Sequence, residues 1–297
     1  MKTKGKRNLT ATLFGGLGNQ LFIYASCRSL SLRLNYELVL DDISGFLNDK
    51  RYRRKCELDK FSLPFYESKI SKREIKIFTP KKRRVQKFVN GILPINYRNY
   101  IYQKGIDFDN VLLEVKPNRS LRIEGYWQSE AYFINNANTI RNEIIIKDSL
   151  SRFNQELLKD INKKSSIAIH LREPNKKIND NLLINLEEYY RKSVDYMIKK
   201  IPNPKFVIFS EKKHSRFIKE LLRGKDALFI EKNDASIDLH LMSKCKHFII
   251  ADSTFSWWGA WLSKYKDKII IAPSYSEYST ERAWGFKGLI PESWILM

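Results

Sequence analysis

Glycine, amide, hydroxyl and cationic side chains gather in three short stretches of the sequence that could hold a phosphate or a sugar. GGLGNQ occupies residues 15–20, HLR residues 170–172 and STFS residues 253–256. Glycines let a backbone approach a ligand closely, and the amides that open a helix form an anion site. Arg172 carries the planar fork of donors that suits a phosphate. The three stretches therefore indicate a ligand with a phosphate or a polar sugar.

Each stretch also has a purely structural interpretation. The glycines can form a tight turn, Arg172 can pair with a carboxylate, and His170 can be a satisfied histidine at a strand end. GYWQSEAYF at 125–133 offers aromatic faces that suit a pyranose ring or packing against a sheet. The three tryptophans that follow STFS at helical spacing are more typical of a core than of a sugar platform: Trp257, Trp258 and Trp261.

Alternating strands and helices should position these residues. In the first half the pattern predicts a strand at 11–16, a helix at 19–34 and a strand at 36–42. From Ser165 to Pro273 it predicts a doubly wound series of strands and helices, and hence an α/β protein with a parallel sheet. Such sheets bind ligands where loops leave the carboxyl ends of the strands.

Composition limits the class of protein. The 297 residues are 43% apolar, enough for two globular domains, and the net charge of +21 favours an anionic partner. Three distant cysteines match neither a disulfide framework nor a zinc site, which predicts a reducing, cytoplasmic location. No segment matches a secretory signal or a transmembrane helix, so we expect no integral membrane protein.

Four stretches, taken in order, resemble the alpha-1,2-fucosyltransferases, a family of glycosyltransferases (family 11) with bacterial and animal members. The similar residues are GGLGNQLF and YA at 15–25, GYWQSE and YF at 125–133, the HLR core at 170–172, and DLHLMSKCKHFIIADSTFSWWGAWL at 238–262. Because they are spread over most of the chain, coincidence is implausible.

The resemblance implies a two-domain glycosyltransferase of the GT-B type with Rossmann-like parallel sheets. Residues 1–150 would form the acceptor-side domain and residues 151–297 the donor domain. The implied reaction transfers L-fucose from GDP-fucose, with inversion and without a bound metal, to the 2-hydroxyl of a galactose-type acceptor. That acceptor would be an oligosaccharide or lipid-linked glycan of the bacterial surface, such as the O antigen of lipopolysaccharide. The expected co-substrate is thus a nucleotide sugar, and no prosthetic group is expected.

The resemblance also implies residue roles. Arg172 would reach the donor pyrophosphate, where negative charge develops as the sugar departs, so a fixed cation there lowers the barrier. Two further groups would contact the nucleotide sugar: the loop residues Gly16, Gly18, Asn19 and Gln20, and the helix-start residues Ser253, Thr254, Phe255 and Ser256.

Two roles stay open at the level of sequence. Asp238 could accept hydrogen bonds from both N–H groups on the Watson–Crick edge of guanine, or it could cap the helix that follows it. An inverting transfer favours a base near the acceptor hydroxyl, and the candidates are Asp41, Asp42 and His170. The two aspartates can equally cap a turn, and a strongly dissociative reaction can proceed without a base.

The central motif departs from the family pattern, in which a second arginine, an aspartate and an aromatic residue follow HLR. Here Glu173 replaces the arginine, Asn175 the aspartate and Lys176 the aromatic residue. An anion in place of a cation weakens the hold on a pyrophosphate. Either Lys176 or Lys177 supplies the charge, or the donor is a different nucleotide sugar, or the activity is weakened.

A basic run at 69–87 favours peripheral contact with an anionic membrane, although a solvated loop has the same composition. We therefore expect a cytoplasmic protein that can lie on the inner face of the cytoplasmic membrane. We expect no nucleic-acid partner, because no nucleic-acid motif is present and aromatic residues do not interleave with the run. A non-catalytic glycan-binding or nucleic-acid-binding protein is a remote alternative.

Overall fold

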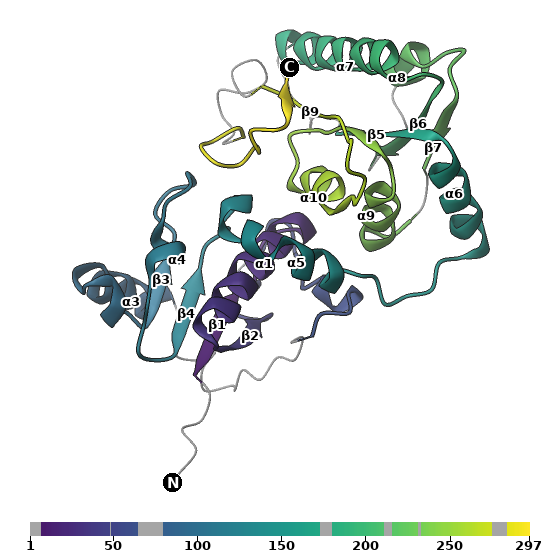
Figure 1. Ribbon diagram of the computed structural model, residues 1–297. Helices are drawn as coiled ribbons and strands as arrows, with labels where there is room; N and C mark the ends of the chain where they lie inside the picture. Colours follow the sequence, from purple (N-terminus) through teal and green to yellow (C-terminus); the bar gives the residue numbers. More distant parts are fainter. Residues whose placement is uncertain are drawn as a thin grey trace. The chain divides into compact units, whose positions relative to one another are not determined.

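The computed structural model describes residues 7–47, 49–64, 80–172, 180–210, 216–230, 233–274 and 284–297. The chain divides into two compact units: Met1–Ile145 with Lys287–Leu289, and Ile146–Phe286 with Ile290–Met297. Each unit is built around a parallel sheet (Figure 1). The return of 287–289 to the first unit, where the Phe108 amide donates to the Lys287 carbonyl at 2.8 Å, was not part of the sequence prediction.

The first unit contains a four-stranded sheet in the order β2-β1-β4-β3. Its strands are β1 (Asn8–Thr12), β2 (Glu37–Asp41), β3 (Tyr100–Tyr102) and β4 (Leu121–Glu124). Its α-helices are α1 (Leu17–Leu34), α3 (Pro80–Ile92), α4 (Val111–Glu114) and α5 (Ala137–Glu143). Short 3-10 helices cover Leu58–Lys60, Ile95–Tyr97, Glu130–Tyr132 and Ile134–Asn136.

The strand predicted at 11–16 is misplaced. β1 begins at Asn8 and ends at Thr12, and the buried side chains Leu9 and Ala11 alternate with more exposed ones at its start. Beyond the strand, Gly15 takes a φ of 78° and Gly16 is the N-cap of α1, so the glycines belong to the turn rather than to the strand.

The second unit contains a six-stranded sheet in the order β10-β9-β8-β5-β6-β7. Its strands are β5 (Ser165–Leu171), β6 (Pro204–Ser210), β7 (Ala227–Phe229), β8 (His247–Ile249), β9 (Ile270–Ala272) and β10 (Ile295–Leu296). Its helices are α6 (Arg152–Lys163), α7 (Asp180–Lys200), α8 (Arg216–Leu221), α9 (Ala235–Ser243) and α10 (Thr254–Leu262). This is the strand order of a doubly wound fold, so the series predicted from Ser165 to Pro273 is confirmed.

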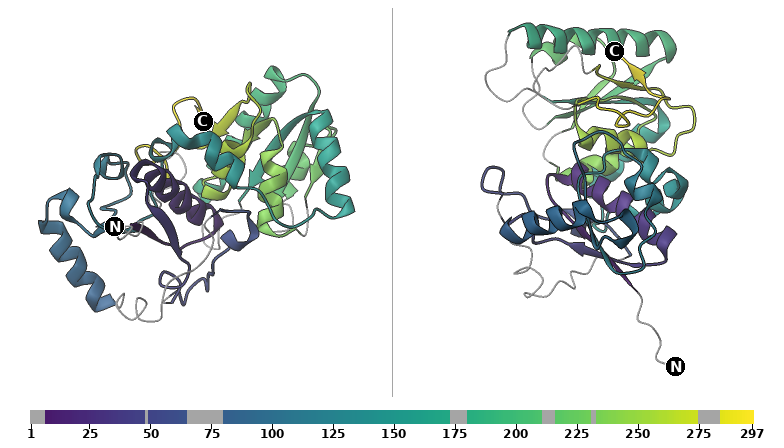
Figure 2. Two further views of the ribbon diagram at one scale, coloured as in Figure 1. Left: turned by 60° about the horizontal axis from the view of Figure 1, so that its bottom comes forward. Right: turned by 90° about the vertical axis from the view of Figure 1, so that its left-hand side faces the viewer.

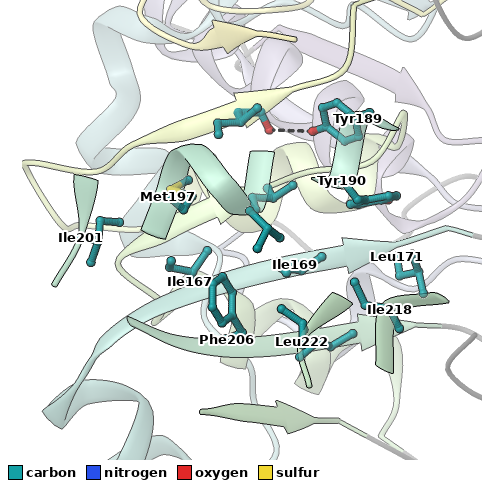
Figure 3. Close-up of a cluster of buried hydrophobic side chains, with 14 residues drawn as sticks. Ile167, Ile169, Leu171, Tyr189, Tyr190, Met197, Ile201, Phe206, Ile218 and Leu222 are labelled. Carbon is teal, nitrogen blue, oxygen red and sulfur yellow. Dashed lines mark hydrogen bonds between the residues drawn. The ribbon is translucent and has the colours of Figure 1, made fainter. Parts of the chain in front are cut away.

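Alternation along β5 divides the core of this unit between two faces. Ile167, Ile169 and Leu171 pack in one cluster with side chains of α7 and α8 (Figure 3). His170, on the opposite face, lies with its ring centroid 5.5 Å from that of Phe255 in α10. The structure confirms the core interpretation of the three tryptophans of α10, which are at most 2% exposed: Trp257, Trp258 and Trp261.

The packing of α9 against α10 depends on a glycine. A Cβ on Gly259 of α10 would collide with the side chain of Met242 in α9, and Met242 is itself buried. Because Met242 is buried, a larger residue at 259 must separate the two helices or force Met242 out of its rotamer.

Gly259→Ala should therefore lower the free energy of unfolding by about 1–3 kcal/mol, although alanine favours helix. The matched control is Gly91→Ala in α3, where a Cβ would meet only the Tyr102 hydroxyl at 3.9 Å. That variant should gain up to about 1 kcal/mol from helix propensity. Urea unfolding monitored by circular dichroism measures both, and equal effects of the two variants would contradict the packing argument.

Candidate active site

The carboxyl ends of β5 and β8 form the switch point of the second sheet. These two strands are neighbours in the sheet, yet the chain continues from β5 into α7 and from β8 into α10. Helices α7 and α10 lie on opposite faces of the sheet (Figure 1). Doubly wound sheets bind their ligands at this position. Two of the three predicted stretches, HLR and STFS, lie here.

Arg172 joins these two stretches. It follows β5 directly, is half-buried, and donates from Nη1 to the backbone carbonyl of Asp252 at 3.1 Å. A guanidinium has five N–H donors, and within the described part of the chain this bond uses one of them. The bond therefore fixes the arginine beside the start of α10 and leaves donors for an anion.

The start of α10 presents backbone amides. Ser253 is its N-cap in an extended conformation, without a side-chain cap, and its carbonyl accepts from the Trp257 amide at 3.0 Å. The hydroxyl of Ser256 is buried and donates to the Ser253 carbonyl at 3.2 Å, so it stabilises the turn. Thr254 and Phe255 are half-buried in the first turn. The amides and partial positive charge of such a terminus attract phosphate.

His170 has the environment of a supporting residue. The imidazole is buried against Phe255, and its backbone carbonyl accepts from the Tyr190 hydroxyl at 2.8 Å. Burial, with a smaller effect of the nearby Arg172 charge, lowers the pKa of His170 to about 3. A ring with so low a proton affinity is a weak base, so this geometry does not favour His170 as the group that deprotonates an acceptor.

Two tyrosines missed in the sequence hold the switch point together from α7. The Tyr189 hydroxyl donates to the carbonyls of Ile250 at 2.6 Å and Ile271 at 3.1 Å, and Tyr190 donates to His170 as described. They thus tie the ends of β5, β8 and β9 to one helix. A buried tyrosine is expected to find a hydrogen-bond partner, so the sequence predicts that such partners exist. It does not predict which carbonyls they are, because these lie far away along the chain.

Asp238 lies on α9, which packs on α10. The N-cap of α9 is Asp234, so the interpretation of Asp238 as the cap is wrong. Its Oδ1 accepts from Asn233 Nδ2 at 3.1 Å, and Asn233 in turn accepts from Asn154 at 3.0 Å. Burial raises the pKa of Asp238 to about 6, although the bond from Asn233 opposes the shift. The carboxylate is therefore poorly solvated and suited to accept hydrogen bonds from a ligand.

The glycine loop of the first unit follows β1, and the GYWQSE stretch follows the neighbouring strand β4. Asn19 accepts from Gln128 Nε2 through its Oδ1 at 2.7 Å, and the rings of Phe14 and Tyr126 stand 4.5 Å apart. A Cβ on Gly15 would crowd both Asn19 and Tyr126. The GGLGNQ and GYWQSE stretches, more than a hundred residues apart, therefore meet at one end of this sheet.

The side chain of Gln20 is engaged by the backbone around it. It is fully buried, donates from Nε2 to the carbonyls of Gly15 and Lys55, both at 2.9 Å, and accepts from the Glu57 amide at 2.9 Å. Gln20 thus holds a neighbouring loop against the glycines, and these bonds do not favour direct contact with a ligand.

The other glycines of the loop are close to the chain itself. Gly18 is buried in the first turn of α1. At Gly16 a Cβ would collide with the guanidinium of Arg54, an exposed cation that the sequence analysis missed. Arg54 comes from a loop with no motif of its own, so only the fold brings it to the start of α1.

The two aspartates after β2 differ. Asp41 is fully buried: its Oδ2 accepts from Arg122 Nη1 at 2.6 Å and its Oδ1 from the Ser44 amide at 2.9 Å. It stabilises the sheet and caps the following turn, so the structure favours the turn-cap interpretation for Asp41 over a role as base. Asp42 is half-buried directly after the strand.

Comparison with known proteins identifies the family. The model of Glycosyl transferase family 11 matches residues 2–287. The chain belongs to this family. The alpha-1,2-colitosyltransferase of Escherichia coli is 32% identical over 298 residues, covering 97% of this chain and 98% of the relative. The O-antigen biosynthesis glycosyltransferase WbnK of Escherichia coli is 31% identical over 285 residues, covering 88% and 92%. The protein is thus a glycosyltransferase.

Solved structures share the fold of this glycosyltransferase. The Bradyrhizobium NodZ alpha-1,6-fucosyltransferase, soaked with GDP-fucose, matches with a TM-score of 0.52 at 14% identity, covering 92% of this chain and 97% of NodZ. A mutant of Arabidopsis thaliana FUT1 in complex with GDP matches with a TM-score of 0.54 at 11% identity, covering 92% and 72%. The predicted GT-B fold with Rossmann-like parallel sheets is confirmed.

Three features of the family 11 chain complete the description. The departed motif, Glu173 to Lys177, lies outside the described residues. Among the residues that are described, no group of three or more His, Cys, Asp or Glu side chains could hold a metal ion. In the same part of the chain, no helix combines the length and apolar character needed to cross a membrane.

Asp238 should make the stability of this glycosyltransferase depend on pH. Its carboxyl ionises near pH 6 in the folded protein and near 3.8 in the unfolded chain, so the folded state carries a penalty above pH 6. The penalty is absent below about pH 3, where both states are protonated, and grows as the pH rises from there to about 6. Asp238→Asn should therefore raise the free energy of unfolding by about 1–3 kcal/mol at pH 7 and leave it unchanged at about pH 3.

Urea unfolding at the two pH values measures this difference. Asp195→Asn is the control, because it makes the same change at an exposed aspartate on another helix, α7. The burial argument fails if Asp238→Asn destabilises the protein at pH 7 or if both variants give the same difference between the two pH values.

Proposed function

We propose that this family 11 glycosyltransferase is an inverting, metal-independent enzyme that transfers L-fucose from GDP-fucose to the 2-hydroxyl of a galactose-type unit in a bacterial surface glycan. The bond from Arg172 to the Asp252 carbonyl carries the proposal, because it fixes a cation beside the start of α10 at the switch point. A role in O-antigen biosynthesis is supported by the similarity to the O-antigen biosynthesis glycosyltransferase WbnK, and a guanosine diphosphate donor by the similarity in fold to structures that hold GDP-fucose or GDP.

The chemistry that these groups support is stabilisation of the leaving group. As the bond between the anomeric carbon and the phosphate oxygen breaks, negative charge grows on the nucleotide diphosphate and positive charge on the sugar. The free donors of Arg172 and the first amides of α10 can hold the developing negative charge. Attack of the acceptor oxygen from the opposite side of the ring then inverts the anomeric centre.

The remaining residues take separate roles in the proposal. Ser253, Thr254 and Phe255 present the first turn of α10 to the phosphates, while Ser256 keeps that turn closed. Asp238 accepts from guanine, since its carboxylate is half-buried and oriented by Asn233.

In the first unit we assign donor contact to Gly16 and Asn19 and a positioning role to Gln20. Gly16 leaves room for the Arg54 guanidinium at the start of α1, and Asn19 is held by Gln128. Gln20 keeps the loop closed through its bonds to the backbone, and Gly18 packs inside α1.

Of the three candidate bases, we assign the role to Asp42. Asp41 is saturated by Arg122 and backbone amides, and His170 is buried with a depressed pKa. Asp42 lies one residue beyond β2, at the carboxyl end of the first sheet, where the glycine loop also lies.

A second donor sugar, colitose, is favoured by a specific observation. The relative that covers 97% of this chain at 32% identity is an alpha-1,2-colitosyltransferase. The alpha-1,2 linkage of this relative matches the transfer to a 2-hydroxyl proposed here. Glu173 and Asn175, which depart from the fucosyltransferase pattern, lie one and three residues after Arg172 and would account for a changed sugar preference.

Nucleotide binding tests the donor class first. GDP should raise the melting temperature of the purified protein, because a ligand that binds only the folded state stabilises it. UDP, ADP and CMP should not, and magnesium should leave the GDP shift unchanged. A shift with a different nucleotide alone would contradict the guanosine donor, and a GDP shift that depends on magnesium would contradict metal independence.

Loss of the Arg172 fork should remove transition-state stabilisation. Arg172→Ala should lower kcat for transfer of fucose from GDP-fucose to a galactoside by about 100-fold to 1000-fold, with an unchanged melting temperature. The control is Arg152→Ala, which removes an arginine that is 94% exposed and pairs with Glu156 on α6. The assay counts labelled sugar transferred from fucose and colitose donors in parallel. Wild-type rates in Arg172→Ala with both donors would overturn the assignment.

A further inference from the structure

Helix α3 packs on the first unit with its polar side. Arg83 pairs with the carboxylate of Glu124 at the end of β4, and Lys87 Nζ lies 3.2 Å from the same carboxylate. Asn90 is buried, and its Oδ1 accepts from the amides of Asn99 at 3.0 Å and Tyr100 at 3.1 Å. The residues of α3 that contact the protein are therefore its charged and amide side chains.

The apolar side of α3 faces solvent. Phe88 and Ile92 are each 71% exposed, Val85 62% and Val89 48%. The spacing of these residues at i, i+3, i+4 and i+7 places them on one stripe of the helix. In an ordinary surface helix such a stripe faces the core. In α3 the apolar side faces solvent instead, and the polar side faces the protein. Leu93 and Tyr97, also exposed, extend the apolar surface beyond the helix.

Rotation of α3 to bury this stripe is prevented by Glu124. That carboxylate is 7% exposed and also accepts from the Tyr100 hydroxyl at 2.7 Å. Turning Arg83 and Lys87 outward would leave a buried charge without cationic partners, which is strongly unfavourable. Helix α3 stands beside the edge strand β3, at the outer edge of the first unit (Figure 2). The exposed stripe is thus a stable feature of the fold.

The charges around the stripe identify its partner. The 13 residues of α3 include five lysines or arginines and no acidic residue. Lys82 and Arg84 are exposed, and the helical period places them on either side of the stripe. Two copies of the helix would bring these cations together, so the surface is not self-complementary. An apolar stripe rimmed by cations is complementary to a bilayer with anionic head groups.

We propose that α3 docks this protein on an anionic lipid bilayer. Val85, Phe88, Val89 and Ile92 enter the boundary between head groups and acyl chains, and Lys82 and Arg84 contact the lipid phosphates. The helix lies in the plane of the membrane surface and does not cross it. This site is separate from the sugar-transfer site, so the proposal does not rest on the proposed function and is tested without donor or acceptor.

Flotation of the full-length protein with lipid vesicles tests the proposal. Wild-type protein should float with vesicles of phosphatidylethanolamine and phosphatidylglycerol and bind much less to phosphatidylcholine vesicles. Phe88→Ser combined with Ile92→Ser should lower the partition coefficient about tenfold or more. Lys82→Gln combined with Arg84→Gln should reduce binding to the anionic vesicles and weaken its dependence on salt.

Phe153→Ser is the matched control, because Phe153 is a 64% exposed phenylalanine on α6 in the second unit. It should bind vesicles as the wild type does. All variants should keep the wild-type melting temperature and circular dichroism spectrum, which separates membrane docking from misfolding. Absence of wild-type binding to anionic vesicles, or full binding by the Phe88 and Ile92 variant, overturns the proposal. A wild-type dimer in sedimentation equilibrium that this variant abolishes would assign the stripe to a second copy instead.

Discussion

The hydrogen bond from Arg172 to the carbonyl of Asp252 joins the ends of β5 and β8, which are neighbours in the sheet. The chain leaves these two strands toward opposite faces (Figure 1), which places α7 and α10, and with them the two halves of the core. Tyr189 and Tyr190 then bind the same strand ends from α7. The cation, the helix start and the supporting tyrosines are therefore consequences of one strand order, and none of them could be assembled on a sheet in which β5 stood at an edge.

The second sheet was predictable because its strands are buried on both faces. Runs such as IAIHL and FVIF are mostly apolar, and helices alternate with these strands along the chain. The strands of the first unit were harder to predict from the sequence. Strands β3 and β4 have three and four residues, too few for a periodic signal, and they become strands only by pairing with β1 and with each other. The start of β1 was missed because basic residues near it resemble a polar tail.

The sequence identified the right neighbourhoods of the candidate site but not the use of each side chain. Gln20 and Ser256 have residue types that bind ligands, yet their polar groups bond to backbone atoms. Asp41, which is buried, likewise has a half-buried arginine partner from β4, Arg122. Partners such as Lys55 and Glu57 for Gln20 come from loops without a motif, so spacing along the chain gives no sign of them. Whether a polar group is available to a ligand is decided by contacts that only the folded chain creates.

The large positive charge illustrates the same distinction. Part of it neutralises buried or half-buried carboxylates: Arg122 pairs with Asp41, Arg28 with Glu143, and Arg83 with Glu124. These arginines stabilise the first unit and have little charge to offer a partner. Arg172 differs because it bonds to a carbonyl, which keeps its full positive charge while fixing its direction. A cation anchored by a neutral acceptor at a switch point is preorganised for an anion, whereas a cation anchored by a carboxylate is already neutralised.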